Sequence, residues 1–310
     1  MDIRLHSTMA ETTFELWPSG LYSLAASIKF LEGFTPAAYE GSGADILRLA
    51  FTADGGEEPA GVMVRSEDGV ILGEVYGDAD TGTVREQVAR ILSLDVDGSG
   101  FPEVGDRDPI VEGLQERYPG LRPVCFNSPY EAAVWAIIGH RIRIVQAARI
   151  KARLAEELGP AVDVDGETLR AFPAPSRLSR LESFPGLFGR KVDYLQSLAK
   201  AAIQGKLDAA HLRSLAVEEA LNELMKLPGI GPFSAELILL RGAGEPDYLP
   251  TKEPRLARAV AMAYGLDEPP DLETLSEIAE RWRSYRTWVA VHLRAMLEEE
   301  TAEIGGARIG

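Results

Sequence analysis

The residues best suited to chemistry lie in one short stretch, from Asp247 to Leu256, which contains carboxylates and a lysine. Glu253 stands directly before Pro254, and because proline favours the first turn of a helix, Glu253 is predicted at a helix start. The helix dipole alone favours a carboxylate there. Such a carboxylate could also stabilise a developing positive charge, or orient and deprotonate a water molecule. Lys252 offers a different chemistry, since an amine can form a Schiff base with a substrate.

A second motif, Leu227 to Ala235, joins two amphipathic helical patterns through a turn that contains Gly229 and Gly231. Glycine permits positive φ angles and lets the backbone approach another molecule closely. The turn also leaves the first amides of the next helix unpaired, where they and the helix dipole suit a phosphate oxygen. Ile230 is expected to pin the two helices together. A tight connection that binds nothing is the alternative, and the complete Leu-Pro-Gly-Ile-Gly string favours the ligand-binding interpretation.

Basic residues form two clusters. Residues 132–155 include no acid, and they contain His140, Arg141, Arg143 and three further bases. The second cluster interleaves arginines with aromatic residues between Arg281 and Arg294. Either cluster could be a solvated helix face or a surface for a polyanion.

The charge distribution decides how the net charge of −16 is interpreted. Affinity for nucleic acid comes largely from Lys and Arg, so this total argues at first against such a partner. However, residues 1–110 hold 20 acidic and 7 basic residues, whereas the remainder holds 28 and 25. The acidity therefore belongs mainly to the N-terminal third.

Residues 1–105 are predicted to form a small α+β domain with an antiparallel sheet. The strand patterns are Thr12–Trp17, Ile46–Thr52, Gly61–Ser66 and Val70–Tyr76, and the helical patterns are Leu21–Phe30 and Thr83–Leu94. The glycine-containing stretch Asp95–Asp108 is expected to be a linker.

Residues 106–310 are predicted to form an all-α domain of short helices, most of them separated by Gly or Pro. The patterns are Pro129–Leu158 with a break near Gly139, Ala174–Ser183, Arg190–Gln204, Asp208–Leu212, Val217–Met225, Pro232–Arg241, Pro254–Tyr264, Asp271–Trp282 and Arg286–Glu300. The predicted fold class is α+β, a small N-terminal sheet unit followed by an all-α bundle.

Composition excludes several classes of protein. Cys125 is the only cysteine, which excludes an intramolecular disulfide, a cysteine-rich zinc site and a four-cysteine iron–sulfur cluster. No apolar run approaches the ~20 residues that span a bilayer, and the first residues lack the pattern of a signal peptide. A cytoplasmic monomer without a membrane partner is the simplest expectation.

The hairpin string resembles the helix-hairpin-helix of DNA glycosylases, in particular that of the bacterial 3-methyladenine DNA glycosylase II family. The similarity includes Ser128–Gly139, Arg190–Ala202 and Ala279–His292, and it is weaker in the N-terminal unit. The resemblance implies an α+β fold with a helix-hairpin-helix bundle. The hairpin signature is specific for DNA-binding folds of this type, but it does not separate enzymes from binding proteins.

The resemblance also implies a catalytic Asp shortly after the hairpin, and the chain departs from the family there. Counting forward from Leu249-Pro250 puts Lys252 at that position, whereas counting back from Leu256–Ala259 puts Glu253 there. We favour Glu253, because the alignment with the family is usually preserved at the start of a helix. Asp247 and Lys252 remain the alternative catalytic residues. Cleavage of an N-glycosidic bond builds positive charge on the sugar, which a carboxylate would stabilise. In lyase-competent relatives the lysine lies within the hairpin, where this chain has Pro232 or Phe233.

The remaining site residues follow from the same resemblance. DNA contacts are expected from Gly229, Ile230, Gly231, His140, Arg141 and Arg143, with Arg141 at the position that wedges into the base stack. The base pocket is expected to include Phe233, Leu237, Tyr285 and Arg294. Phe233 would stack on the extruded base, unless it is a core residue. Arg294 replaces an aromatic residue, and its charge would repel a cationic alkylated purine. No cofactor is expected except a structural monovalent cation at the backbone of Leu227, Gly229 and Ile230.

The leading hypothesis is a glycosylase that removes damaged, in particular alkylated, bases from double-stranded DNA. It would flip the nucleotide into a pocket between the sheet-bearing unit and the helical bundle and hydrolyse the glycosidic bond. One alternative is a non-catalytic DNA-binding protein on the same scaffold. Another is an interaction module whose acidic N-terminal unit binds a basic protein.

Overall fold

The computed structural model describes residues 12–33 and 45–301. Its N-terminal unit is an antiparallel sheet of strand order β1-β4-β3-β2, made of β1 (Thr12–Leu16), β2 (Ile46–Thr52), β3 (Pro59–Glu67) and β4 (Val70–Tyr76). Buried and less buried residues alternate along β4, because successive side chains of a strand point to opposite faces. The buried face shares a core with α1 (Leu24–Gly33) and α2 (Thr81–Ile91), which lie where the sequence predicted two helices.

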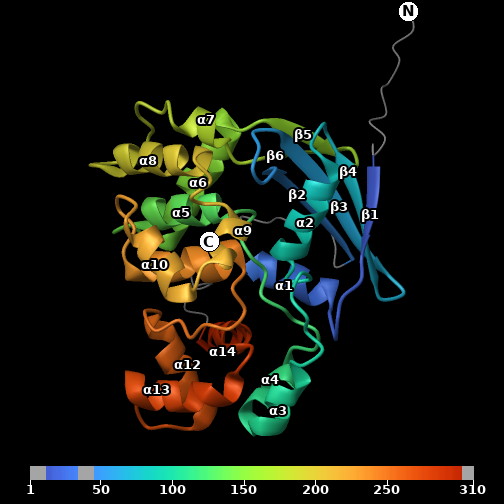
Figure 1. The fold of residues 1–310 in the computed structure, drawn as a ribbon, viewed down its shortest axis with the longest axis vertical. Helices are drawn as coiled ribbons and strands as arrows, with labels where there is room; N and C mark the ends of the chain where they lie inside the picture. Colours follow the sequence, from blue (N-terminus) through green and yellow to red (C-terminus); the bar gives the residue numbers. More distant parts are fainter. Residues whose placement is uncertain (1–11, 34–44, 302–310) are drawn as a thin grey trace, which may run out of the picture.

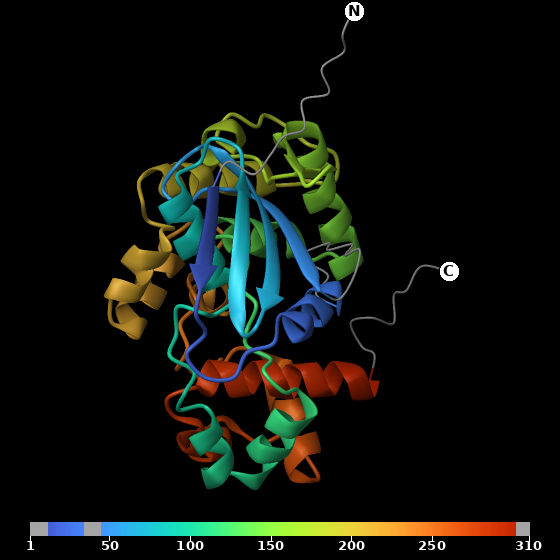
Figure 2. The same ribbon diagram turned by 90° about the vertical axis from the view of Figure 1, so that its right-hand side faces the viewer.

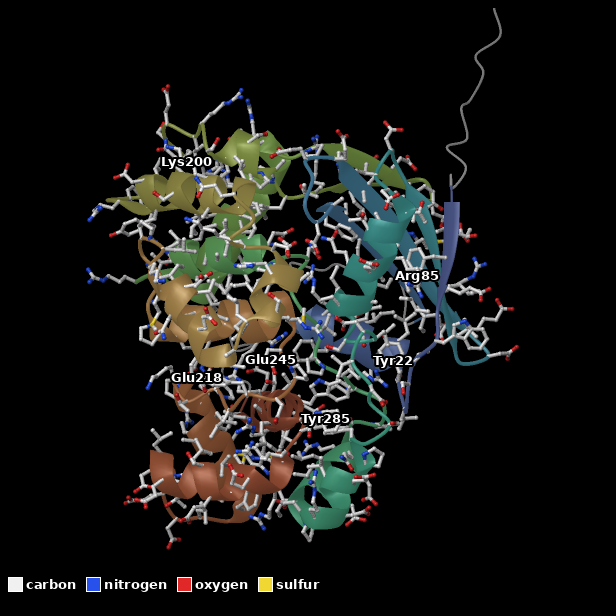
Figure 3. All side chains as sticks on the ribbon, in the orientation of Figure 1. Tyr22, Arg85, Lys200, Glu218, Glu245 and Tyr285 are labelled. Atoms are coloured by element: carbon white, nitrogen blue, oxygen red, sulfur yellow. The ribbon has the colours of Figure 1, made fainter. Side chains whose placement is uncertain are left out.

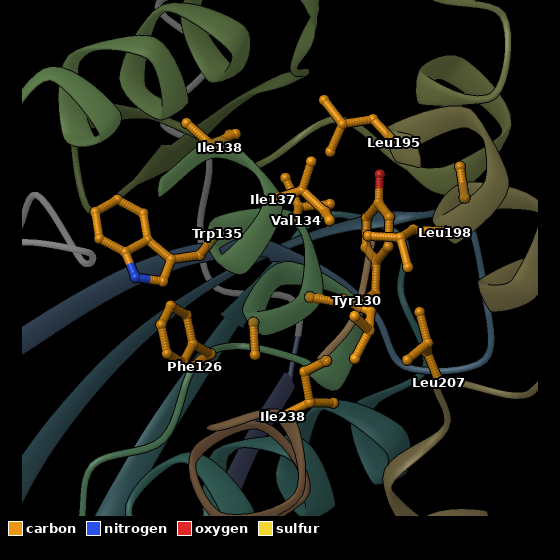
Figure 4. Packing of buried hydrophobic residues seen from close by; sticks show 14 of the residues in the cluster. Phe126, Tyr130, Val134, Trp135, Ile137, Ile138, Leu195, Leu198, Leu207 and Ile238 are labelled. Carbon is orange, nitrogen blue, oxygen red and sulfur yellow. The ribbon is translucent and has the colours of Figure 1, made fainter. Parts of the chain in front are cut away.

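The largest core belongs to the helices in the middle of the chain. They are α5 (Pro129–Gly139), α6 (Ile144–Leu158), α7 (Pro175–Leu178), α8 (Lys191–Ile203), α9 (Ala209–Ser214), α10 (Val217–Met225), α11 (Pro232–Leu237) and the π-helix η2 (Ile238–Ala243). Helix α5 lies at the centre, with every residue from Pro129 to Ile138 buried. Figure 4 shows its side chains packed against Leu195 and Leu198 of α8 and Ile238 of η2.

A third core lies at the far end of the molecule from α7 and α8 (Figure 1). It contains α3 (Pro102–Arg107), α4 (Pro109–Arg117), α12 (Pro254–Tyr264), α13 (Leu272–Ala279), η3 (Glu280–Trp282) and α14 (Arg286–Thr301). Figure 2 shows α14 crossing between the sheet and the pair α3–α4. None of the helices within residues 12–33 and 45–301 is long and apolar enough to cross a membrane.

The prediction of a linker over Asp95–Asp108 is wrong, because this stretch folds into the protein. Phe101 and Val104 are buried in the third core, and residues 102–107 form α3. The glycines serve packing: a Cβ atom on Gly98 would lie 2.5 Å from Nη2 of Arg122. The predicted domain boundary near residue 105 stays a prediction.

The expected fold class is confirmed, with one addition that the sequence did not predict. A short hairpin of β5 (Ala161–Val164) and β6 (Glu167–Arg170) interrupts the helical unit. It packs on β3, where a Cβ atom on Gly61 would lie 2.5 Å from Cγ2 of Val164. Strands of four residues are too short to show a clear alternation, so the pattern was hidden among helices.

Arg90 of α2 joins the sheet unit to the helices. Its side chain is buried and donates hydrogen bonds to the carbonyl oxygens of Phe126, Asn127 and Gly242, and it pairs with Asp54 at 2.8 Å. These carbonyls lie just before α5 and within η2, so one guanidinium holds both to the N-terminal unit.

Candidate active site and nucleic-acid interface

The turn between α10 and α11 has two glycines with different roles. Gly229 has φ of +86°, and a Cβ atom there would lie 2.7 Å from Cδ1 of Ile137 and from Cδ2 of Tyr194, so the position requires glycine. Gly231 has φ of −101° and ψ of −179°, an extended conformation, and a Cβ atom there would meet nothing within 4 Å. The expectation of positive φ therefore holds for Gly229 alone, while Gly231 leaves the backbone accessible.

Ile230 pins the hairpin as expected, since its side chain is buried in the main helical core. Its amide donates to the carbonyl oxygen of Leu227 at 3.1 Å. That oxygen retains a second lone pair. A carbonyl oxygen with a free lone pair could bind a monovalent cation. The expected site at Leu227, Gly229 and Ile230 stays a prediction. Within the described residues, no group of three or more His, Cys, Asp or Glu could hold a metal ion.

The basic loop between α5 and α6 begins close to the hairpin, because Gly229 lies against Ile137, near the end of α5. Arg141, in the left-handed region at φ of 57°, and Arg143 are both exposed. Lys191, at the start of α8, donates to the carbonyl oxygen of Ile138 at 2.8 Å, and burial lowers its pKa. Burial also lowers the pKa of His140, and the charges of Lys191 and Arg141 lower it further.

Glu253 lies at the start of α12, as predicted. Its carboxylate accepts the amide of Arg255 at 3.1 Å and forms an ion pair with Nη1 of Arg294 at 3.5 Å. The side chains of Glu253 and Arg294 are 22% and 23% exposed, so both are partly buried. The structure thus brings together two residues that the sequence placed in one site.

The alternative catalytic residues differ from Glu253 in their surroundings. Asp247 accepts the amide of Arg286 at 3.2 Å and pairs with its guanidinium at 2.8 Å, so it caps the start of α14. Lys252 is exposed, and its backbone amide donates to Glu236 at 2.9 Å. These contacts give Asp247 a structural role.

Glu236 is the residue of this region that the sequence did not single out. It is 5% exposed, lies one turn after Phe233, and accepts hydrogen bonds from the Thr251 hydroxyl at 3.0 Å and from the Lys252 amide. Burial raises the pKa of Glu236, although hydrogen bonds from Lys252 and Thr251 oppose the shift. The available signal was a single carboxylate inside the apolar run Ala235–Leu240.

The four predicted pocket residues occupy different surroundings. Phe233 is 47% exposed, which disfavours the alternative of a core residue, and Leu237 packs partly buried against the main core. The hydroxyl of Tyr285, which is labelled in Figure 3, donates to the carbonyl oxygen of Asp97 at 2.6 Å. Tyr285 is thereby tied to the segment before α3, and its role in the pocket stays a prediction.

The candidate site lies between two groups of helices. Phe233 and Glu236 belong to α11, whereas Glu253 caps the start of α12 and Arg294 belongs to α14. Glu236 holds the loop before α12 against α11. The pocket predicted between the sheet unit and the helices stays a prediction.

Comparisons with known proteins agree with this architecture. No protein-family model matches the chain. The chain is 24% identical to a DNA-3-methyladenine glycosylase of Bacillus subtilis, over 69% of this chain and 73% of that protein. It is 30% identical to the probable bifunctional transcriptional activator/DNA repair enzyme AlkA of Mycobacterium tuberculosis, over 72% of this chain but only 44% of that protein.

A solved structure shows the same fold over nearly the whole chain. The 3-methyladenine DNA glycosylase of Archaeoglobus fulgidus superposes with a TM-score of 0.76 at 23% identity, covering 94% of this chain and 99% of that one. The sequence relatives and the hairpin geometry agree with this likeness. The chain is therefore similar in sequence to DNA-3-methyladenine glycosylases and shares the fold of a solved 3-methyladenine DNA glycosylase.

Proposed function

We propose that this protein is a DNA repair glycosylase that hydrolyses the N-glycosidic bond of a damaged base, in particular an alkylated base, in double-stranded DNA. One observation carries the proposal: Glu253 and the exposed Phe233 lie on two segments that Glu236 joins. An aromatic ring that can stack on a base and a carboxylate that can act on its sugar thus belong to one site.

In this proposal the hairpin and the basic loop bind the DNA backbone. The amides near Gly231 approach a phosphate, and Arg141 and Arg143 add positive charge from the neighbouring loop. Arg141 enters the base stack as the target nucleotide leaves it. A cation at the carbonyl oxygens of Leu227, Gly229 and Ile230 would add positive charge beside the phosphate.

The chemistry belongs to Glu253. As the bond between C1′ and the base nitrogen breaks, the electron pair goes to the base and positive charge develops on the sugar. The Glu253 carboxylate stabilises this charge and accepts a proton from the water whose oxygen bonds to C1′. The route needs no Schiff base. We propose that the protein acts in the cytoplasm as a monomer.

The ion pair between Glu253 and Arg294 favours a second candidate function, that of a DNA-binding protein without catalysis. A guanidinium 3.5 Å from the carboxylate partly neutralises the charge that the reaction needs. The two functions share the DNA surface and differ only in base release.

The test measures base release from duplexes that contain an alkylated base, with Glu253→Gln compared with the wild type. Because the substitution keeps size and removes charge, release should fall by about 10²-fold or more. DNA binding should stay the same or tighten. Lys252→Ala should remain active, and borohydride should trap no covalent complex. If the wild type releases no base from alkylated, deaminated or oxidised DNA, the binding-protein function replaces the enzymatic one.

A further inference from the structure

We infer that Glu236 is a positioning residue, which fixes the loop before α12 to the second hairpin helix and so sets the place of Glu253. The inference rests on the proposed function. It adds a role for a residue that touches neither the base nor the sugar.

The two oxygens of the Glu236 carboxylate accept hydrogen bonds from two consecutive residues. Oε1 accepts the Thr251 hydroxyl at 3.0 Å, and Oε2 accepts the Lys252 amide at 2.9 Å. Glu253 follows directly, so the tether ends one residue before the proposed catalytic carboxylate. Both loop groups are donors, and the amides at the start of a helix are donors as well, so the start of α12 cannot replace Glu236 as their acceptor.

The burial of Glu236 is costly, which argues against a purely structural role. The residue is 5% exposed and its neighbours Ala235, Ile238 and Leu239 are apolar and buried. A carboxylate in such surroundings loses hydration, and an apolar side chain of similar volume at such a position is often neutral or stabilising. The hydrogen bonds to the loop offset this cost.

The consequence for catalysis is geometric. The backbone bond from Lys252 fixes the chain before Glu253, while the Arg255 amide and Arg294 hold its carboxylate. An error of about 1 Å in the position of a reacting group can lower a rate by about 10²-fold. The same tether joins Glu253 to the helix that bears Phe233, so the base contact and the carboxylate form one unit.

The test compares Glu236→Leu with Glu236→Gln. Leucine removes the tether and fits the apolar surroundings, so a structural role predicts unchanged activity and unchanged or higher stability. A positioning role predicts that Glu236→Leu lowers the single-turnover rate of base release at least about tenfold. Affinity for a duplex with a tetrahydrofuran abasic site should stay within about twofold. Glutamine keeps an acceptor for the Lys252 amide, so it should retain the rate within about threefold.

Amide hydrogen exchange supplies a readout that does not depend on activity. The Lys252 amide should exchange faster in Glu236→Leu than in the wild type, because its acceptor is lost. Glu131→Gln is the matched control. Glu131 is also buried, but it bonds Asn127 at 3.1 Å and Lys151 at 3.2 Å, away from the loop. This control should lower the melting temperature and leave both the release rate and Lys252 exchange unchanged.

Either a wild-type release rate or wild-type exchange at Lys252 in Glu236→Leu would overturn the inference. A protein whose wild type releases no base refutes the proposed function instead. In that case faster exchange at Lys252 in Glu236→Leu alone would still establish the tether. The two failures are therefore distinguishable.

Discussion

Arg294 and Glu253 form an ion pair between two helices, with 3.5 Å from the guanidinium Nη1 to the carboxylate Oε1. Arg294 projects from the middle of α14, and Glu253 stands at the start of α12. The proposed catalytic anion is thus accompanied by a cation. The charge that the site presents to a base depends on both residues.

Arg294→Met should shift the preference of the site toward cationic bases. Two like charges about 4 Å apart repel by up to about 4 kcal/mol at an effective dielectric constant of 20, so removing Arg294 relieves that repulsion. We expect the ratio of release rates, 7-methylguanine over neutral hypoxanthine, to rise about tenfold. Arg294→Lys should leave the ratio near its wild-type value. An unchanged ratio in Arg294→Met would show that Arg294 does not face the base.

Substitutions at the two hairpin glycines should separate folding from binding. Gly229→Ala places a Cβ atom 2.7 Å from Ile137 and Tyr194 at a positive φ, and should destabilise the protein by about 1–3 kcal/mol in urea unfolding. Gly231→Val enters open space at an extended backbone and should leave the fold intact. It should weaken binding to duplexes of any sequence about tenfold, because one phosphate contact is lost. If a folded Gly231→Val variant binds DNA with wild-type affinity, the hairpin does not contact the DNA.

Asp247→Asn should affect stability rather than chemistry. The carboxylate accepts the Arg286 amide and pairs with its guanidinium, and the substitution removes the charge at the start of α14. The free energy of unfolding should fall by about 1–2 kcal/mol. Base release per folded molecule should not change. If release disappears in a folded Asp247→Asn, the catalytic acid lies six residues earlier in the chain than Glu253.

His292 should make the protein less stable in acid. It is 1% exposed, its Nδ1 lies 2.9 Å from the Trp288 carbonyl oxygen, and burial lowers its pKa from 6.5 to about 4. The unfolded chain therefore binds a proton that the folded protein does not bind between these pH values. The stabilising contribution is present above pH 6.5 and is lost as the pH falls toward 4.

The expected loss from this one residue is about 3 kcal/mol over that window. Urea unfolding at pH 7 and pH 4.5 measures it, with His292→Gln as the comparison. The variant should show a smaller difference between the two pH values, because glutamine does not titrate. If both proteins lose the same free energy of unfolding between pH 7 and pH 4.5, His292 is not the cause of the acid destabilisation.

Local signals explain why much of the helical fold could be predicted. The predicted bounds of α12 agree with the structure, because Pro254 starts the helix and Gly265, at φ of +67°, ends it. The linker prediction failed because the packing of Gly98 against Arg122 is a contact between distant residues that composition does not reveal. The hairpin β5–β6 was missed because its strands have only four residues each, and because β3, on which it packs, lies far away in the sequence.

The site residues also divide into those that local signals predict and those whose roles depend on distant contacts. Glu253 could be predicted from its place before Pro254, a local relationship. The role of Glu236 depends on Thr251 and Lys252, which come from a later loop, and the role of Asp247 depends on Arg286 from a distant helix. Each of these partners requires the three-dimensional structure, because a sequence pattern describes only neighbours along an element.

The guanidinium of Arg90 also explains why an acidic domain can accompany a DNA surface. It joins α2 to the backbone at Phe126, Asn127 and Gly242, and so connects the sheet unit to the helices. The sheet β1–β4 lies on the right of Figure 1, whereas α10, which leads into the hairpin, lies on the left. Because residues 1–110 carry most of the net charge, the molecule is expected to have an electric dipole moment. In the proposed function, the field of the DNA would turn the less acidic hairpin side toward the duplex before contact.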